Sequence, residues 1–471
     1  MTANRTTSNL ILNSPGALRP LLVLAWPVLV GQLLDMLVGF TDIWLTGNYL
    51  IGDRYLAAMT QTSYVLWLLT GMFSLVSIGA AALIARFIGA QDQTGAHRTL
   101  NQAVLLGAVV CLLPVLLMTV FAPLLSQALG LDDETSHLVQ RYLWILLPAV
   151  PAMMIEQVGV STLRAAGDTV TGVVAMVLVN VVDMVVSYVL VRGVGPFAEL
   201  GWDGLAIGTT VGYLVGTLVI VVRLFNGRSG LQIQRRFLLP DWSLVRRILR
   251  ISIPGGLDTL SLIACHLWFV RIVSALGNFE VAAHGVAIRI ESIGYLPALA
   301  FQVAVATMVG QLLGANQPRK ANHAVSVACI TTVVFMSCMA TLMLLGSDWM
   351  ASQFVNEKQE NIAIEAASLV RIVAFVQPVL AILMILIGTL RGAGDTRWPL
   401  VITFVGLLGV RIPLAYCLAW SEMVLPITGT VVPLVGLGVR GAWYAMVADL
   451  SVRCALILLH YRRGKWQKTI V

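Results

Sequence analysis

Charged residues are scarce in this 471-residue chain. Lys, Arg, Asp and Glu together make up 11 % of it, against about 25 % in ordinary soluble domains. Hydrophobic residues make up 58 %, and the mean hydropathy is +0.87. No stretch of roughly 100 residues, the usual size of a domain, has a soluble composition. The composition therefore excludes an appended soluble domain and predicts an integral membrane protein made almost entirely of spans.

Motifs of catalysis and metal binding are also missing. The chain has no Gly-x-x-x-x-Gly-Lys-Ser/Thr loop for a nucleotide phosphate, no Gly-x-Ser-x-Gly and no His-Glu-x-x-His. Its six cysteines form no Cys-x-x-Cys pair, so neither metal ligation nor a disulfide framework is indicated. We expect a protein that is not an enzyme, has no cofactor and holds no structural metal.

Apolar runs of about 20 residues predict an all-α integral membrane protein with twelve transmembrane helices. The alternating pattern of an outer-membrane barrel is absent. The expected spans are 19–46, 55–85, 100–122, 139–161, 171–191, 203–225, 251–275, 281–311, 324–346, 363–388, 399–420 and 436–460.

Positive charge is distributed unevenly among the predicted loops. With a cytoplasmic N-terminus, every cytoplasmic loop carries Arg or Lys, whereas the opposite loops hold only Arg54, Arg192 and Lys358. The positive-inside rule then predicts a multi-pass protein of the plasma (inner) membrane with both termini cytoplasmic. The net charge of +7 is mostly this topology signal, so we expect membrane lipids and no nucleic acid as partners.

One octapeptide occurs twice. Residues 162–169 read Thr-Leu-Arg-Ala-Ala-Gly-Asp-Thr, and residues 389–396, 227 positions later, differ only at the fourth residue. The spacing is about half of the chain, so we expect two copies of one six-span unit, related by an axis along the membrane normal. The expected division is an N-terminal lobe at 1–225, a basic cytoplasmic linker at 226–249 and a C-terminal lobe at 250–471.

The octapeptides themselves are typical of tight cytoplasmic turns between spans. The glycine can take a left-handed conformation at a helix end, the aspartate can cap the next helix, and the arginine is a cation near a helix C-terminus. Direct contact with a substrate is not expected there. The residues concerned are Arg164, Gly167, Asp168, Arg391, Gly394 and Asp395.

The chain resembles the multidrug and toxic compound extrusion (MATE) family over nearly its whole length. The features that carry the resemblance are the two octapeptides, Trp26-Pro27, the segment 39–47 (Gly-Phe-Thr-Asp-Ile-Trp-Leu-Thr-Gly), Ala282-Ala283-His284 and the segment 310–315 (Gly-Gln-Leu-Leu-Gly-Ala). The resemblance implies two six-helix bundles with a V-shaped cavity between them. It also implies export of bulky, often cationic aromatic compounds in exchange for inward H⁺ or Na⁺, and we expect a monomer.

Carboxylates inside the spans are the expected ion-coupling residues, because a buried charge is costly without a partner or a function. Asp42 matches the carboxylate that the family carries in span 1, and Asp35 lies two helical turns before it, where the family more often has an amide. In span 5 the chain departs from the family, since Asp183 takes the place of an Asn and Ser187 that of an acid. The expected set is Asp42, Asp183, Asp35 and Asn180.

The identity of the coupling ion stays open. Na⁺ needs several oxygen ligands, which the groups around Asp42 and Asp183 can supply, whereas H⁺ needs a single tunable carboxylate and is slightly favoured. Aromatic, Met and amide side chains suit a promiscuous substrate cavity. The candidates are Gln32, Gln61, Tyr64, Trp67, Met72 and Tyr295.

Two other classes of function remain as alternatives. A flippase for lipid-linked precursors shares the two-bundle architecture, and it would use arginines for the diphosphate. The basic second lobe keeps this alternative open through Arg271, Arg289, Arg411 and Arg440, although internal salt bridges are the simpler reading of its charges. A membrane-embedded enzyme would need a nucleophile or metal set that the sequence does not show.

Overall fold

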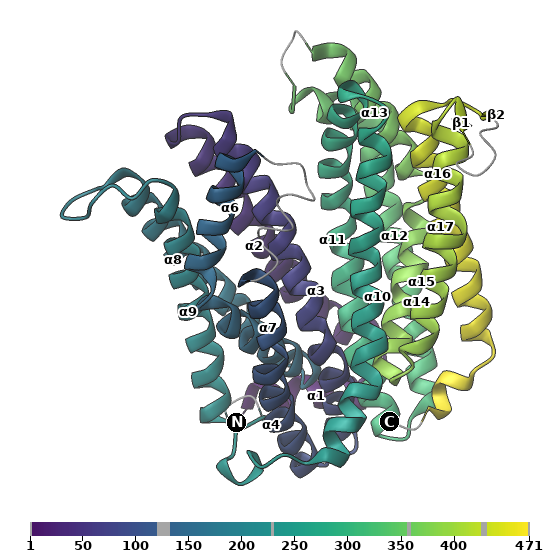
Figure 1. Ribbon diagram of the computed structural model, residues 1–471. Coiled ribbons are helices and arrows are strands. Elements are labelled where there is room, and N and C mark those ends of the chain that lie inside the picture. Colours follow the sequence, from purple (N-terminus) through teal and green to yellow (C-terminus); the bar gives the residue numbers. More distant parts are fainter. Residues whose placement is uncertain (1, 120–131, 228–229, 356–358, 425–430, 470–471) are drawn as a thin grey trace.

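A computed structural model describes residues 2–119, 132–227, 230–355, 359–424 and 431–469, and they form two helical bundles (Figure 1). The N lobe comprises α2 (Leu18–Tyr49), α3 (Asp53–Gly89), α4 (Gln93–Val110), α6 (Asp133–Leu146), α7 (Ala149–Ala165), α8 (Val170–Arg192) and α9 (Trp202–Asn226). The C lobe comprises α10 (Trp242–Ser274), α11 (Asn278–Gly314), α12 (Pro318–Ser352), α13 (Glu360–Ala374), α14 (Gln377–Ala393), α15 (Arg397–Gly406), a π-helical turn (Leu407–Arg411), α16 (Ile412–Ala419) and α17 (Gly438–Arg462).

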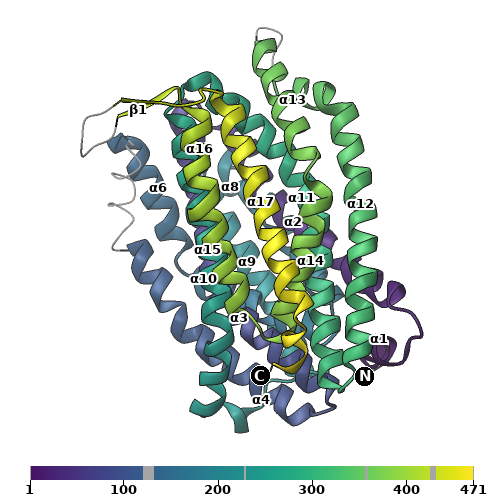
Figure 2. The same cartoon turned by 90° about the vertical axis from the view of Figure 1, so that its right-hand side faces the viewer.

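Smaller elements lie at the two ends of the bundles. A short helix, α1 (Thr2–Asn13), precedes α2, and the 3₁₀ turns Arg235–Phe237 and Lys465–Lys468 lie at the same end as both termini (Figures 1 and 2). The strands β1 (Glu422–Val424) and β2 (Val431–Pro433) pair antiparallel at the opposite end. The sequence analysis did not foresee this hairpin, whose three-residue strands interrupt an otherwise helical protein.

The expected number of spans is confirmed. Ten helices in the described parts of the chain are long and apolar enough to cross a membrane, and two bent pairs bring the number to twelve. The bent pairs are α6 with α7, at 62°, and α13 with α14, at 53°. Proline lies at both breaks, as Pro148 before α7 and Pro378 in the first turn of α14, because its ring prevents a helix from continuing unbroken.

The octapeptide turns have the same backbone in both lobes. Gly167 and Gly394 are left-handed, with φ of +93° and +84°. The N–H of Asp168 donates to the Leu163 carbonyl at 2.8 Å, and the N–H of Asp395 donates to that of Leu390 at the same distance. These are the hydrogen bonds of a helix that ends on a left-handed glycine. The repeated octapeptide therefore forms the same turn in both lobes.

The two lobes meet along α3, which packs against α10 and, near the end that carries the termini, crosses α11. A Cβ at Gly89 would overlap the backbone of Gln311, and one at Gly314 would overlap that of Arg86. Arg86 donates to the Ala393 carbonyl at 3.1 Å, and Gln311 donates to the Ala165 carbonyl at 2.8 Å. Each lobe thus holds the octapeptide of the other, and the bundles splay apart toward the opposite end (Figure 1).

The linker between the lobes is shorter than expected. Helix α10 begins at Trp242, so residues 242–249 belong to the C lobe's first helix. Gln102 of α4 fixes the preceding loop by donating to the carbonyls of Phe237 and Leu239 at 2.9 and 2.8 Å. Asp241 caps α10, and the Ser243 hydroxyl, with the backbone N–H of Leu244, lowers the pKa of its carboxyl.

Candidate functional site

Asp42 of α2 and Asp183 of α8 lie together inside the N lobe, 2 % and 0 % exposed. The Thr209 hydroxyl of α9 is 3.3 Å from Asp42 Oδ2 and 3.3 Å from Asp183 Oδ1. The Tyr142 hydroxyl of α6 lies 3.3 Å from Asp42 Oδ2 and 3.1 Å from Thr209 Oγ1. Ser187 donates to Asp183 Oδ1 at 3.1 Å. Four helices thus contribute to one cluster, which we call the enclosed acid pair.

The enclosed acid pair has unused acceptors. Asp42 Oδ1 and Asp183 Oδ2 are buried and have no hydrogen-bond partner among the described residues. No Lys, Arg or His lies within 4.0 Å of either carboxylate in that part of the chain. Since a buried carboxylate needs a proton, a cation or donors, the cluster is suited to bind H⁺ or a small cation through its free oxygens.

Glycines allow the close approach of α8 and α9 that forms this cluster. A Cβ at Gly208 would overlap Ser187, and one at Gly212 would lie 3.1 Å from the Asp183 Cβ. Small residues bring helix backbones close together in membranes, so Thr209, between these two glycines, is held against Asp183. Sequence reasoning missed Thr209 and Tyr142, and the glycine spacing around Thr209 was the signal available.

Asn180 and Asp35 lie outside the enclosed acid pair. Asn180 donates to the Leu34 carbonyl at 2.9 Å and the Met176 carbonyl at 2.8 Å, so it fastens α8 to α2. Asp35 is exposed to a separate cavity of about 160 Å³ that Glu156 and Arg164 also line. The expected group of four therefore divides into a buried pair, a helix fastener and a residue of a second cavity.

A central cavity of about 320 Å³ lies between the lobes. Gln32 and Trp67 are among its lining residues, and the Trp67 ring meets His266 of the other lobe edge to face at 5.2 Å. Tyr64, Gln61 and Tyr295 are half-buried and are not among the lining residues. Met72 is only 5 % exposed and also lies outside this lining. Two of the six substrate candidates thus face the cavity in this conformation.

The octapeptide arginines face the same cavity, contrary to their expected role in the turns alone. Arg164 and Arg391 both contribute to its lining. Arg391 pairs with Asp258 of α10 at 2.7 Å. The side chains of these arginines therefore extend from the turns into the space between the lobes.

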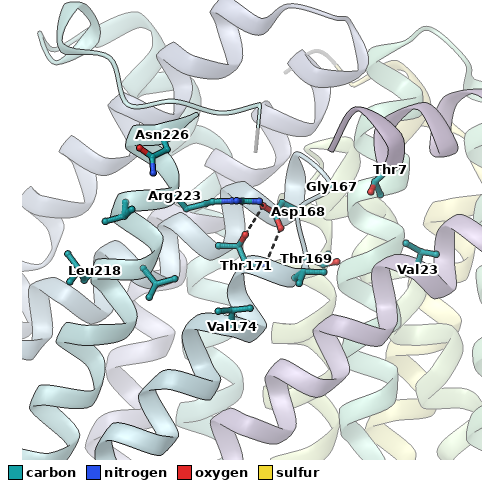
Figure 3. Close-up of a pocket in the computed structure, with 13 residues that line it drawn as sticks. Thr7, Val23, Gly167, Asp168, Thr169, Thr171, Val174, Leu218, Arg223 and Asn226 are labelled. Carbon is teal, nitrogen blue, oxygen red and sulfur yellow. Dashed lines mark hydrogen bonds and ion pairs between the residues drawn. The ribbon is translucent and has the colours of Figure 1, made fainter. Parts of the chain in front are cut away.

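The aspartates of the two turns differ. Asp168 accepts from the N–H of Thr171 at 3.0 Å and from its hydroxyl at 2.7 Å, and Arg223 lies 3.6 Å from it (Figure 3). This group borders a lateral pocket of about 690 Å³ between α2, α8 and α9. Asp395 instead pairs with His460 at 2.9 Å, and the helix after it has no side-chain cap. The expected cap is therefore present in the first lobe and wrong for the second.

Four acids of the C lobe are paired with arginine, namely Asp258, Asp348, Glu365 and Asp449. Asp449 is 0 % exposed and lies 2.8 Å from Arg453 and 2.9 Å from Arg411. Arg440 holds Glu365 through two bonds of 2.6 and 2.8 Å. The reading of these charges as internal salt bridges therefore agrees with the geometry.

Comparison with known proteins places the chain in a family. The family model described as MatE matches residues 27–189 and again 254–417, so it covers each lobe once. The chain is 27 % identical to the probable multidrug resistance protein NorM of Thermotoga maritima over 97 % of this chain and 95 % of that protein. It is 26 % identical to the probable NorM of Idiomarina loihiensis, over 96 % and 95 %.

Solved structures share the fold. A MOP superfamily transporter from Pyrococcus furiosus superposes with a TM-score of 0.87 at 22 % identity, over 98 % of this chain and 99 % of that one. An outward-facing multidrug resistance MATE family transporter superposes with a TM-score of 0.86 at 21 % identity, over the same shares. The protein is a multi-pass membrane transporter rather than an enzyme, and it belongs to the MATE family.

Proposed function

We propose that this protein exports organic compounds, many of them cationic, from the cell in exchange for inward H⁺ or Na⁺. The observation that carries the proposal is the enclosed acid pair, because Asp42 and Asp183 are buried with two free carboxylate oxygens. The relatives named multidrug resistance proteins support the substrate class. The basic loops at the end of both termini support a cytoplasmic position for that end.

In the proposed cycle, the enclosed acid pair is empty when the central cavity faces the cytoplasm and holds substrate. Rocking of the lobes about the α3–α11 crossing then exposes the cavity outward. Binding of H⁺ or Na⁺ to Asp42 and Asp183 neutralises the pair and changes how α2 packs on α8 and α9. Substrate affinity falls, the substrate leaves, and the ion-loaded carrier returns. Antiport requires that the two ligands disfavour each other's binding.

Both candidate ions fit the donors of the enclosed acid pair. Na⁺ would find oxygen ligands in the two carboxylates and in the Thr209 and Ser187 hydroxyls. H⁺ would need only one of the carboxylates, and we favour it slightly because two neighbouring buried acids disfavour each other's ionised form, which promotes protonation of one of them. Whether a pH gradient or a Na⁺ gradient drives transport decides between the two ions.

Proteoliposomes test this proposal. A cationic dye is loaded and its efflux is measured under an imposed pH gradient or an imposed Na⁺ gradient. We expect one gradient to drive efflux and Asp42→Asn to abolish the coupling. Asp203→Asn, which removes a half-buried acid of α9 paired with the exposed Arg141, is the matched control and should transport like the wild type. Correctly oriented protein without gradient-driven efflux would contradict the antiporter.

A flippase for lipid-linked diphosphates is the second candidate, because Arg164 and Arg391 both line the central cavity. Part of its original support is lost, since Arg411 is paired with Asp449 and Arg440 with Glu365. The pairing of Arg391 with Asp258 reduces the positive charge further. Absence of dye efflux together with transbilayer movement of a lipid-linked diphosphate would favour this alternative.

A further inference from the structure

A side cavity in the N lobe adjoins the central cavity. Its volume is about 160 Å³, and α2, α3, α7, α8 and α9 contribute to its wall. Gln32, Thr70, Gln157 and Arg164 line both spaces. Because these residues line both spaces, the side cavity lies directly beside a ligand in the central cavity.

The side cavity holds two acids that no arginine neutralises at close range. Asp35 is exposed into it, and Glu156 is 5 % exposed with its Oε1 lacking a hydrogen-bond partner among the described residues. Arg164 runs alongside Gly31, one helical turn before Asp35, since its Nη2 would lie 3.3 Å from a Cβ there. No ion pair within 4.0 Å joins Arg164 to either acid in the described chain. Two carboxyl groups thus stand against one guanidinium, so the cavity carries one excess negative charge when a bound cation keeps both acids ionised.

Part of the remaining wall is aromatic and thioether in character. Phe73, Tyr213, Met153 and Met176 line the space together with the acids. Aromatic faces attract cations, and Met side chains adapt to ligands of different shape. At roughly 30 Å³ for each water, the cavity exceeds the volume that a bare ion needs. Charge, size and wall therefore match an ammonium group on an alkyl chain.

We propose that the side cavity is a subsite for the protonated amine of the transported compound. Asp35 and Glu156 accept hydrogen bonds from the amine N–H groups, and the apolar body of the compound lies in the central cavity against Trp67, Ile263 and Leu299. This subsite rests on the proposed export of organic cations and adds the site that binds their charged group. The sequence placed Asp35 with the coupling ion, whereas the structure places it with Glu156.

The position of this subsite also supplies a coupling between substrate and ion. Asp35 precedes Asp42 by seven residues of α2, a rise of about 10 Å. Tyr213 lines the side cavity one turn after Thr209 of the enclosed acid pair. Two positive charges about 10 Å apart inside a protein weaken each other's binding roughly tenfold. An ammonium in the side cavity and a cation on the enclosed acid pair therefore oppose each other, as antiport requires.

Two fluorescent probes of matched shape test the subsite on protein in lipid nanodiscs. Dansylcadaverine carries a primary ammonium on an aromatic body, and N-pentyl dansylamide has the same body and chain without the charge. We expect the wild type to bind the charged probe at least tenfold more tightly. The double variant Asp35→Asn with Glu156→Gln should reduce this preference to within threefold, with unchanged affinity for the neutral probe. Asp35→Asn alone, at an exposed position, serves if the double variant does not fold.

Asp42→Asn separates the subsite from the coupling site. This variant should lose gradient-driven efflux. Because it removes one negative charge about 10 Å from the side cavity, it should weaken dansylcadaverine binding about as much as ion binding does, and it should leave the affinity for the neutral probe unchanged. A preference that survives in the acid-free double variant, or that the wild type lacks, overturns the subsite and leaves the antiporter standing wherever dye efflux persists. A wild type with the expected preference but without gradient-driven efflux overturns the proposed transport instead.

Discussion

The N lobe and the C lobe have the same scaffold but treat their buried acids differently. In the N lobe, Asp42 and Asp183 share hydroxyl donors and have free carboxylate oxygens. In the C lobe, Asp449 is held by two arginines and Asp258 by one. An acid paired with arginine is neutralised by the protein itself, whereas a buried acid without a cationic partner needs a bound proton or cation. The difference supports the proposal that the coupling ion binds in the N lobe, and it agrees with a structural role for the ion pairs of the C lobe.

The duplicated chain therefore conserved its turns while its chemistry diverged. The octapeptide turns and the α3–α11 crossing obey the repeat closely, down to Gly89 and Gly314 at equivalent places. Gly167 and Gly394 need a left-handed backbone, and Gly89 and Gly314 have no room for a Cβ, so glycine suits both kinds of position. The buried acids need only a hydrogen-bond donor or a counter-charge, and the N lobe supplies hydroxyl groups where the C lobe supplies arginines.

Neutralising one acid in each lobe should give the largest contrast. Asp449→Asn leaves Arg411 and Arg453 without their shared carboxylate, so we expect a loss of stability of about 3–5 kcal/mol. Asp183→Asn removes an acid with no arginine partner and should leave the stability equal or higher. Thermal unfolding of the purified protein in one detergent measures both.

A control within the C lobe tests whether unpaired arginines cause the loss of stability in Asp449→Asn. Asp449→Asn combined with Arg411→Met and Arg453→Met removes all three charges and should recover part of the lost stability, as replacement of buried ion pairs by apolar residues does. If Asp183→Asn costs as much stability as Asp449→Asn, the enclosed acid pair is structural like the C lobe's ion pairs, and the comparison between the lobes is wrong.

Sequence reasoning reached the spans, the repeat and the turns, because each depends on local composition. Long apolar runs predict spans, and a local sequence motif predicts the turns at Gly167 and Gly394. Thr209 was not predictable in the same way, since helical Thr hydroxyls commonly bond their own backbone, as Thr46 and Thr62 do here. The glycines at 208 and 212 indicate a close helix approach beside Thr209, but they do not show that the approaching helix carries a carboxylate.

Helix packing decides the remaining assignments. Asp35 and Asp42 share one face of α2 by helical spacing, but α7 brings Glu156 to one of them and α8 brings Asp183 to the other. The bends of the fourth and tenth spans were not foreseen either, because hydropathy reports where a chain crosses and not how straight it is. Contacts between helices that are distant in the sequence thus determine which acids lie together in the candidate site.

A glycine next to the C lobe's ion pairs offers the next largest effect. A Cβ at Gly406 would overlap Asp449 Oδ1 and Arg453 Cγ, so Gly406→Ala should disturb the buried pair and cost about 1–3 kcal/mol. Gly409, three residues later in the same span, has open space around its Cβ position. Gly409→Ala is the matched control and should change the unfolding temperature little. Equal effects of the two changes would show that the span, and not the ion pair, is sensitive.

The smallest effect concerns a pair of surface salt bridges that occupy similar places with opposite polarity. Asp203 in the first turn of α9 pairs with Arg141 of α6, and Arg440 in the first turn of α17 pairs with Glu365 of α13. Alignment of Leu200-Gly201 with Leu437-Gly438 makes Asp203 and Arg440 equivalent.

Both salt bridges hold a bent span against the last span of its lobe, and reversal of their polarity shows that the contact and not the sign was retained. Because the arginines are 65 % and 47 % exposed, solvent screens each pair. We expect Asp203→Asn and Glu365→Gln each to lower the unfolding temperature less than Gly406→Ala does. The difference from the wild type should vanish at about 1 M NaCl, where the Debye length is about 3 Å. A loss that persists at high salt would mean that these carboxylates act through packing, and the two lobes would then share a rigid contact rather than an electrostatic one.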